Sequence, residues 1–116
     1  MDAFTAAYVE AALWSSTGTE GVSLDREHDV CDLAPETLAG MVADCASFQE
    51  AYGELIAGAE ERAGHDFWLT RNGHGAGFWD GDWSAWDGAR LTEASHRYGP
   101  YELYVGDDGL IWGGSG

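Results

Sequence analysis

The segment 65–80 carries the residue types that could perform chemistry. Two histidines, two carboxylates, an arginine and an amide fall in this stretch: His65, Asp66, Arg71, Asn72, His74 and Asp80. A histidine beside a carboxylate can exchange protons near neutral pH, and it can bind a metal when further ligands converge. His65 with Asp80 offers only two ligands, so we expect no metal and no other cofactor. A hydrogen bond that ties a strand end is the structural explanation of the same pair.

The local sequence around these residues predicts a β-hairpin. Residues 67–71 are rich in strand formers, and Asn72-Gly73 is the strongest short signal for a two-residue hairpin turn. Antiparallel pairing of 67–71 with 74–79 places His65 opposite Asp80 at the open end. Some six residues of strand, roughly 20 Å, then separate that end from the turn. One compact site cannot contain both ends, which weakens a catalytic interpretation.

The turn allows two interpretations. Arg71 at an exposed tip could bind a carboxylate or phosphate of a partner, with His74 as a second donor. Alternatively, Arg71 forms an internal salt bridge with one of the 21 acidic residues. The glycines at 73 and 75 could cradle an anion. Alternatively, Gly73 only completes the turn, and the glycines at 75 and 77 leave room for Thr70 and Trp68 to lie across the strand.

Tryptophan is concentrated in the same region, at positions 68, 79, 83 and 86. If helices cover only the Phe67 face of the hairpin, the opposite face is exposed and marks a partner site; otherwise it is a second layer of core. No catalytic residue is assigned. The candidate partner-binding residues are Trp68, Arg71, Asn72, His74, Trp79 and Trp83, with His65 and Asp80 as the alternative polar pair.

The chain is strongly acidic. Its formal net charge is -16, from 21 acidic residues and 5 arginines, with no lysine. Such a charge repels nucleic acid and anionic membranes, so we expect neither as a direct partner. It favours a basic partner surface, or simply solubility, and it allows mimicry of DNA. With no signal peptide and no apolar stretch of about 20 residues, the sequence predicts a cytoplasmic protein.

The remaining segments predict a single domain over residues 1–116. Helical spacing follows an N-cap at Asp2, and a second, longer helix with a bend or break near Gly53 ends at Gly64. Cys45 is expected to be buried on that helix. The predicted fold is α+β, with two N-terminal helices packed on an antiparallel sheet made of two β-hairpins separated by a short helix. Residues 1–63 are expected to be mainly helical, with the first helix over 3–15. Residues 64–112 are expected to form a hairpin–helix–hairpin unit, in which Asp87 caps a helix over 88–98 and strands follow over 101–105 and 110–112. Residues 113–116 are expected to be a flexible tail.

Five blocks of the chain carry a resemblance to known proteins: Ala12–Thr17, Leu33–Leu38, Met41–Cys45, Gly64–Asp80 and Tyr101–Gly109. Together they resemble a family of small accessory proteins of tailed bacteriophages, including phages of actinobacteria. The resemblance implies a phage-encoded protein in the host cytoplasm. We expect it to bind a host macromolecule, a protein in particular, and to alter its behaviour. The alternative is a small enzyme or an anion- or metal-binding module built on the 65–80 hairpin.

Overall fold

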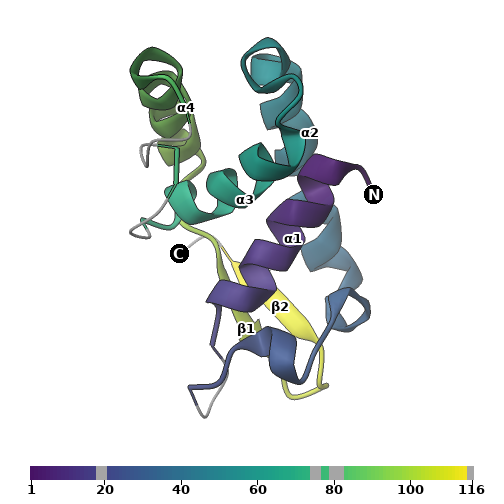
Figure 1. The fold of residues 1–116 in the computed structure, drawn as a ribbon. Coiled ribbons are helices and arrows are strands. Elements are labelled where there is room, and N and C mark those ends of the chain that lie inside the picture. The colour runs from purple at the N-terminus through teal and green to yellow at the C-terminus, as the bar shows by residue number, and fades with distance from the viewer. Residues whose placement is uncertain (18–20, 74–76, 79–82, 115–116) are drawn as a thin grey trace.

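A computed structural model describes residues 1–17, 21–73, 77–78 and 83–114. In this part of the chain, four α-helices surround an aromatic core, and a two-stranded antiparallel sheet lies at one end (Figure 1). None of these helices is long and apolar enough to cross a membrane. The elements are α1 (Ala3–Ser15), η1 (Leu24–Arg26), η2 (Val30–Asp32), α2 (Pro35–Ile56), α3 (Glu60–Arg71), α4 (Ala85–Tyr98), β1 (Glu102–Val105) and β2 (Ile111–Gly114), where η marks a 3-10 helix.

The protein is therefore mostly helical, and the predicted α+β fold with two hairpins is wrong. Residues 67–71, expected to be a strand, form the last turns of α3, and all five are buried. Gly73 has a φ of 71°, and its N–H donates to the carbonyl of Thr70, so the Asn72-Gly73 pair ends a helix. A glycine at positive φ serves a helix C-terminus as readily as a hairpin turn. Most of the predicted return strand, 74–76 and 79, lies outside the described residues.

Helix α3 packs directly along α1, and Gly64 makes this approach possible. A Cβ at Gly64 would collide with the backbone carbonyl of Phe4 on α1. Gly64 was expected to end the long helix, but it lies inside α3. Aromatic rings fill the space beside this contact, and the Phe48 ring of α2 stacks on the Phe67 ring of α3 at 4.3 Å between centroids. Close backbone packing between α1 and α3 therefore organises the core.

The two N-terminal helices follow their predictions more closely. Helix α1 spans the expected residues, and the Asp2 carboxylate caps it by accepting from the Thr5 N–H at 2.8 Å. Helix α2 bends at Tyr52, beside the predicted break at Gly53, and ends at Ile56. Cys45 of α2 is fully buried, as expected.

The C-terminal part of the chain also agrees with the sequence in outline. Helix α4 ends at Gly99, which has a φ of 74°, but it begins earlier than predicted because Ser84, and not Asp87, provides the N-cap. The second predicted hairpin forms, with Tyr104 opposite Trp112 in its register. Strand β2 continues to Gly114, so the tail predicted to be flexible begins inside a strand.

Candidate functional surfaces

Arg71 lies in the core, with 4% of its surface exposed. Its Nε donates to the carbonyl of Gly99 at 2.8 Å, and its Nη2 donates to the carbonyl of Tyr98 at 3.0 Å. Its Nη1 donates to the Tyr8 hydroxyl at 3.0 Å and forms a 2.9 Å salt bridge with Asp44. Three aromatic rings surround the guanidinium, at 5.3 to 5.7 Å from its carbon atom. The internal salt bridge is confirmed, and the expected position of Arg71 at an exposed turn is wrong.

The pKa values of Arg71 and Tyr8 are both raised in this buried cluster. Burial alone would lower the pKa of Arg71, but the nearby Tyr8 hydroxyl and Asp44 carboxylate outweigh it, so the pKa is raised. Burial also raises the pKa of Tyr8 above its ordinary value of 10.0, against the opposing effect of Arg71. Arg71 therefore remains charged and Tyr8 remains neutral. The cluster connects α1, α2, α3 and the end of α4.

Trp68 and Asn72 serve the same internal framework. The Trp68 side chain is buried, and its indole N–H donates to the Ser15 hydroxyl at 2.7 Å. The Asn72 amide donates to the carbonyl of Trp68 at 3.0 Å, and its oxygen accepts from the N–H of Tyr101 at 2.8 Å. These contacts connect α3 to the end of α1 and to the start of the sheet. Trp68 belongs to the core, so the interpretation as a second core layer holds for it and its assignment to an exposed partner face is wrong.

Trp83 is half-buried and satisfies a buried carboxylate. Its indole N–H donates to Asp66 at 2.8 Å, and its ring lies 5.3 Å from the Phe78 ring. Trp86, in the first turn of α4, is 77% exposed. The described tryptophans of the cluster therefore do not form one surface. Three predicted site residues lie outside the described part of the chain: His74, Trp79 and Asp80.

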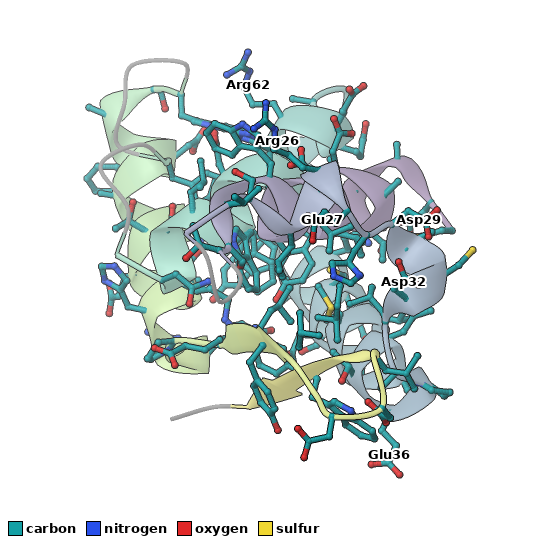
Figure 2. The ribbon with its side chains drawn as sticks, turned by 90° about the horizontal axis from the view of Figure 1, so that it is seen from below. Arg26, Glu27, Asp29, Asp32, Glu36 and Arg62 are labelled. Atoms are coloured by element: carbon teal, nitrogen blue, oxygen red, sulfur yellow. The ribbon has the colours of Figure 1, made fainter. Side chains whose placement is uncertain are left out.

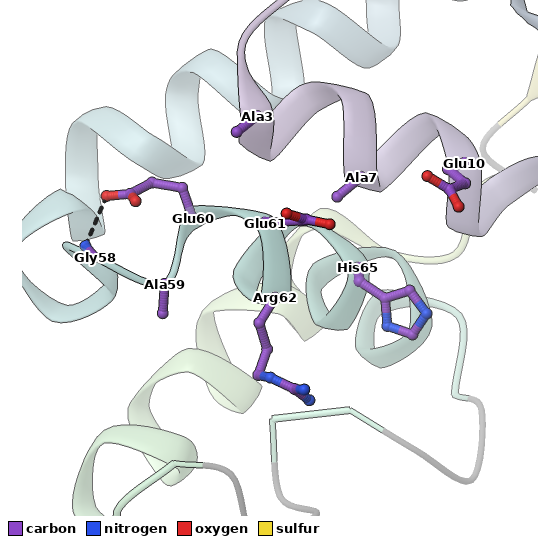
Figure 3. A pocket seen from close by; sticks show the side chains of 9 residues that line it. All are labelled: Ala3, Ala7, Glu10, Gly58, Ala59, Glu60, Glu61, Arg62 and His65. Atoms are coloured by element: carbon purple, nitrogen blue, oxygen red, sulfur yellow. Dashed lines mark hydrogen bonds between the residues drawn. The ribbon is translucent and has the colours of Figure 1, made fainter.

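His65 lines an open groove of about 710 Å³ between α1 and α3 (Figure 3). Its side chain is 46% exposed, its Nδ1 lies 3.6 Å from Asp66, and its ring lies 6.2 Å from that of Trp14. Of the groove carboxylates, Glu60 accepts a 2.9 Å hydrogen bond from the Gly58 N–H. Among the described residues, no group of three or more His, Cys, Asp or Glu side chains is placed to hold a metal.

Carboxylates are frequent in η1, η2, the start of α2 and the hairpin, elements that Figure 1 shows away from the α2–α3 connection. The segment from η1 to the start of α2 meets the sheet there, because the Ala34 N–H donates to the Ile111 carbonyl and the Gly113 N–H donates to the Thr37 hydroxyl. Within 24–36 and 102–114 the only lysine or arginine is Arg26, and in Figure 2 it lies on the opposite side of the view from Glu36. We call this surface the acidic end: Asp25, Glu27, Asp29, Asp32, Glu36, Glu102, Asp107 and Asp108.

Some of these carboxylates stabilise local structure, and the others remain available. Asp29 and Asp32 form a capping box around η2. Hydrogen bonds from the Leu110 N–H and the Trp112 indole lower the pKa of Asp108. The remaining five make no hydrogen bond or salt bridge with the described residues: Asp25, Glu27, Glu36, Glu102 and Asp107.

Exposed apolar side chains accompany the carboxylates at this end. Tyr104 is 57% exposed, and Val30 and Val105 are each 37% exposed. The sequence indicated only a solvated acidic loop around His28, because the strand residues that complete the surface lie about 70 positions further along the chain.

Comparisons with protein-family models, curated proteins and solved structures found no match for the chain.

Proposed function

We propose that this protein binds a basic surface of another protein through its acidic end. The supporting observation is the arrangement of eight carboxylates and one arginine over η1, η2, the start of α2 and the hairpin. Complementary charge steers association and selects partners, and a net charge of -16 extends that attraction beyond direct contact. The resemblance to small phage proteins makes a host protein the proposed partner.

The mixture of side chains favours a protein partner. An interface needs an apolar centre that excludes water as well as a charged rim. Tyr104, Val105 and Val30 supply exposed apolar surface among the carboxylates. A nucleic acid is disfavoured because its phosphates carry the same sign of charge. A partner that normally binds DNA is a specific version of this proposal, in which the carboxylates occupy the positions of phosphates.

Binding is favoured over catalysis by the state of the polar residues. The arginine that the sequence suggested for anion binding is used internally by Tyr8, Asp44 and two backbone carbonyls. His65 meets one carboxylate in a half-exposed position. The carboxylates of the acidic end that have no partner among the described residues, in contrast, can contact a cationic surface.

Two matched variants test the proposal. The acidic-end variant combines Glu27→Gln, Glu36→Gln, Glu102→Gln and Asp107→Asn. The control variant removes four charges elsewhere on the surface, by Glu50→Gln, Glu54→Gln, Glu61→Gln and Glu93→Gln. Both variants carry the same net charge, so a difference between them reports the location of the carboxylates.

The measurement is affinity capture from a bacterial host lysate with mass spectrometry, followed by titration of the purified captured protein. We expect the acidic-end variant to lose the partner and the control variant to retain it. We also expect weaker capture by the unaltered protein at about 0.5 M salt, where charges are screened within a few ångströms. Equal capture by the two variants would reject the acidic end as the binding surface. For the DNA-mimic version, the protein must also compete with DNA for the captured partner in gel-shift assays.

A further inference from the structure

Among the described residues, strand β1 pairs with β2 alone, which leaves its other edge open. Val105 lies opposite Ile111 in the ladder, and the Gly106 N–H donates to the Leu110 carbonyl one position further along. Because hydrogen-bonded and non-hydrogen-bonded pairs alternate in an antiparallel ladder, Val105 directs its N–H and C=O away from β2. Leu103, two residues earlier, does the same. The outer edge of β1 therefore carries two N–H groups and two carbonyls, at Val105, which is 37% exposed, and at Leu103, which is 7% exposed.

The opposite edge of the sheet confirms this alternation. On β2, the Ile111 carbonyl accepts from Ala34, and the Gly113 N–H donates to Thr37, so both point away from β1. The outer edge of β2 is therefore covered by the start of α2. No described residue provides an equivalent partner for the outward groups of Leu103 and Val105.

A groove of about 290 Å³ runs beside the start of this open edge. Its walls include Ser15 at the end of α1, Ser16 and Thr17 after it, and also Tyr101, Glu102 and Leu103. An incoming strand needs space next to the edge and hydrogen-bonding groups along it. Both features are present at β1.

We propose that an extended, lysine- or arginine-rich segment of the partner adds to β1 as a third strand. The charge around the edge selects a cationic segment, because residues 99–114 contain Glu102, Asp107 and Asp108 and no lysine or arginine. Tyr104, 57% exposed, adds an aromatic face that favours a cationic side chain. Pairing of two copies through β1 would bring these carboxylates together with their counterparts, and like charges on neighbouring strands are destabilising.

This inference rests on the proposed function and specifies how the partner binds at the acidic end. The probe is a capped peptide of about nine residues that alternates lysine and valine. Its affinity is measured by fluorescence anisotropy, and amide hydrogen exchange is followed by NMR. We expect the amides of Leu103 and Val105 to become protected when the peptide binds.

Val105→Pro is the decisive variant, and Val105→Thr is its matched control. Proline removes the outward N–H of residue 105, which the ladder with β2 does not use, and proline is tolerated on such an edge. We expect Val105→Pro to weaken peptide binding at least about tenfold and Val105→Thr to leave it within about twofold. A second measurement keeps the unaltered protein and methylates alternate backbone nitrogens of the peptide. Methylation in one register should abolish binding, and methylation in the other should not.

Several results would overturn the inference. With the alternating peptide, these results are no binding at all, equal affinity for the proline and threonine variants, or no protection of the Leu103 and Val105 amides. Equal effects of the two methylation registers would also overturn it, as would self-association through β1 in light scattering. If partner capture still depends on the acidic-end carboxylates in such a case, the proposed function stands and strand addition is wrong. If Val105→Pro alone weakens capture while the acidic-end variant does not, charge recognition fails instead.

Discussion

Replacing Arg71 by methionine should remove much of the stability of this domain. Methionine keeps most of the volume but donates no hydrogen bond. The Tyr8 hydroxyl and the carbonyls of Tyr98 and Gly99 then lose a donor in a buried or half-buried position. An unsatisfied buried group costs about 1–3 kcal/mol, and breaking a buried ion pair costs about 3–5 kcal/mol. Asp44 is one-third exposed and can be hydrated, so we expect a total loss of about 4 kcal/mol.

The assay is urea denaturation followed by tryptophan fluorescence, with thermal melting as a second readout. A loss of about 4 kcal/mol is a large part of the 5–15 kcal/mol typical of a domain, and it corresponds to roughly 15 °C in Tm. Arg97→Met is the matched control, because Arg97 is exposed and pairs with the equally exposed Glu93, and it should change stability by less than about 0.5 kcal/mol. A loss below about 1 kcal/mol for Arg71→Met would refute the role of Arg71 as the link between the four helices.

Three further predictions concern the framework. Gly64→Ala should destabilise the fold by at least about 2 kcal/mol in urea, because its methyl group collides with α1, whereas Gly53→Ala, with open space around it, should be neutral or stabilising. Asp2→Ala should cost about 1 kcal/mol at neutral pH. Capping lowers the pKa of Asp2 below 3.8, so the stabilisation is complete above that pH and disappears as the pH falls through the folded pKa. If Asp2→Ala still destabilised the protein by the full amount at lower pH, the stabilisation would not come from the ionised carboxylate. Burial raises the pKa of Cys45 to about 12. A thiol reagent at pH 8 should therefore modify only the exposed Cys31 in the native protein, and both thiols in denaturant. Reaction of both thiols in the native protein would contradict the burial of Cys45.

The sequence alone determined the elements whose signals are local. The apolar spacing after Asp2 specified α1, and the turn residues 106–109 specified the hairpin of β1 and β2. Glycine at position 99 marked the end of α4. In each case the residues that specify the element lie within it or directly beside it, so no distant contact is needed. The net charge likewise follows from composition, and it predicted either a basic partner surface or solubility alone.

Tertiary structure decided that residues 60–73 form a helix and its end, and not a strand and a hairpin turn. Phe67 and Trp68 favour strands in isolation, but α3 is buried over most of its surface, so its apolar residues follow no simple period. Asn72-Gly73 fits a hairpin turn and a helix end equally, because both need a residue at positive φ. Packing against α1 favours the helix, and this close packing requires glycine at position 64, where a Cβ would collide with the backbone of Phe4.

The buried Arg71 cluster and the acidic end also depend on contacts between residues far apart in the sequence. Arg71 became a core residue because Tyr8, Asp44 and the carbonyls of 98 and 99 converge on it from separate helices and a turn. The acidic end joins carboxylates from 25–36 with those of 102–108, and hydrogen bonds from Ala34 to Ile111 and from Gly113 to Thr37 hold these two segments together. Composition can count charges, but their placement on one surface requires the packed chain, since electrostatic recognition depends on distances between residues far apart in sequence.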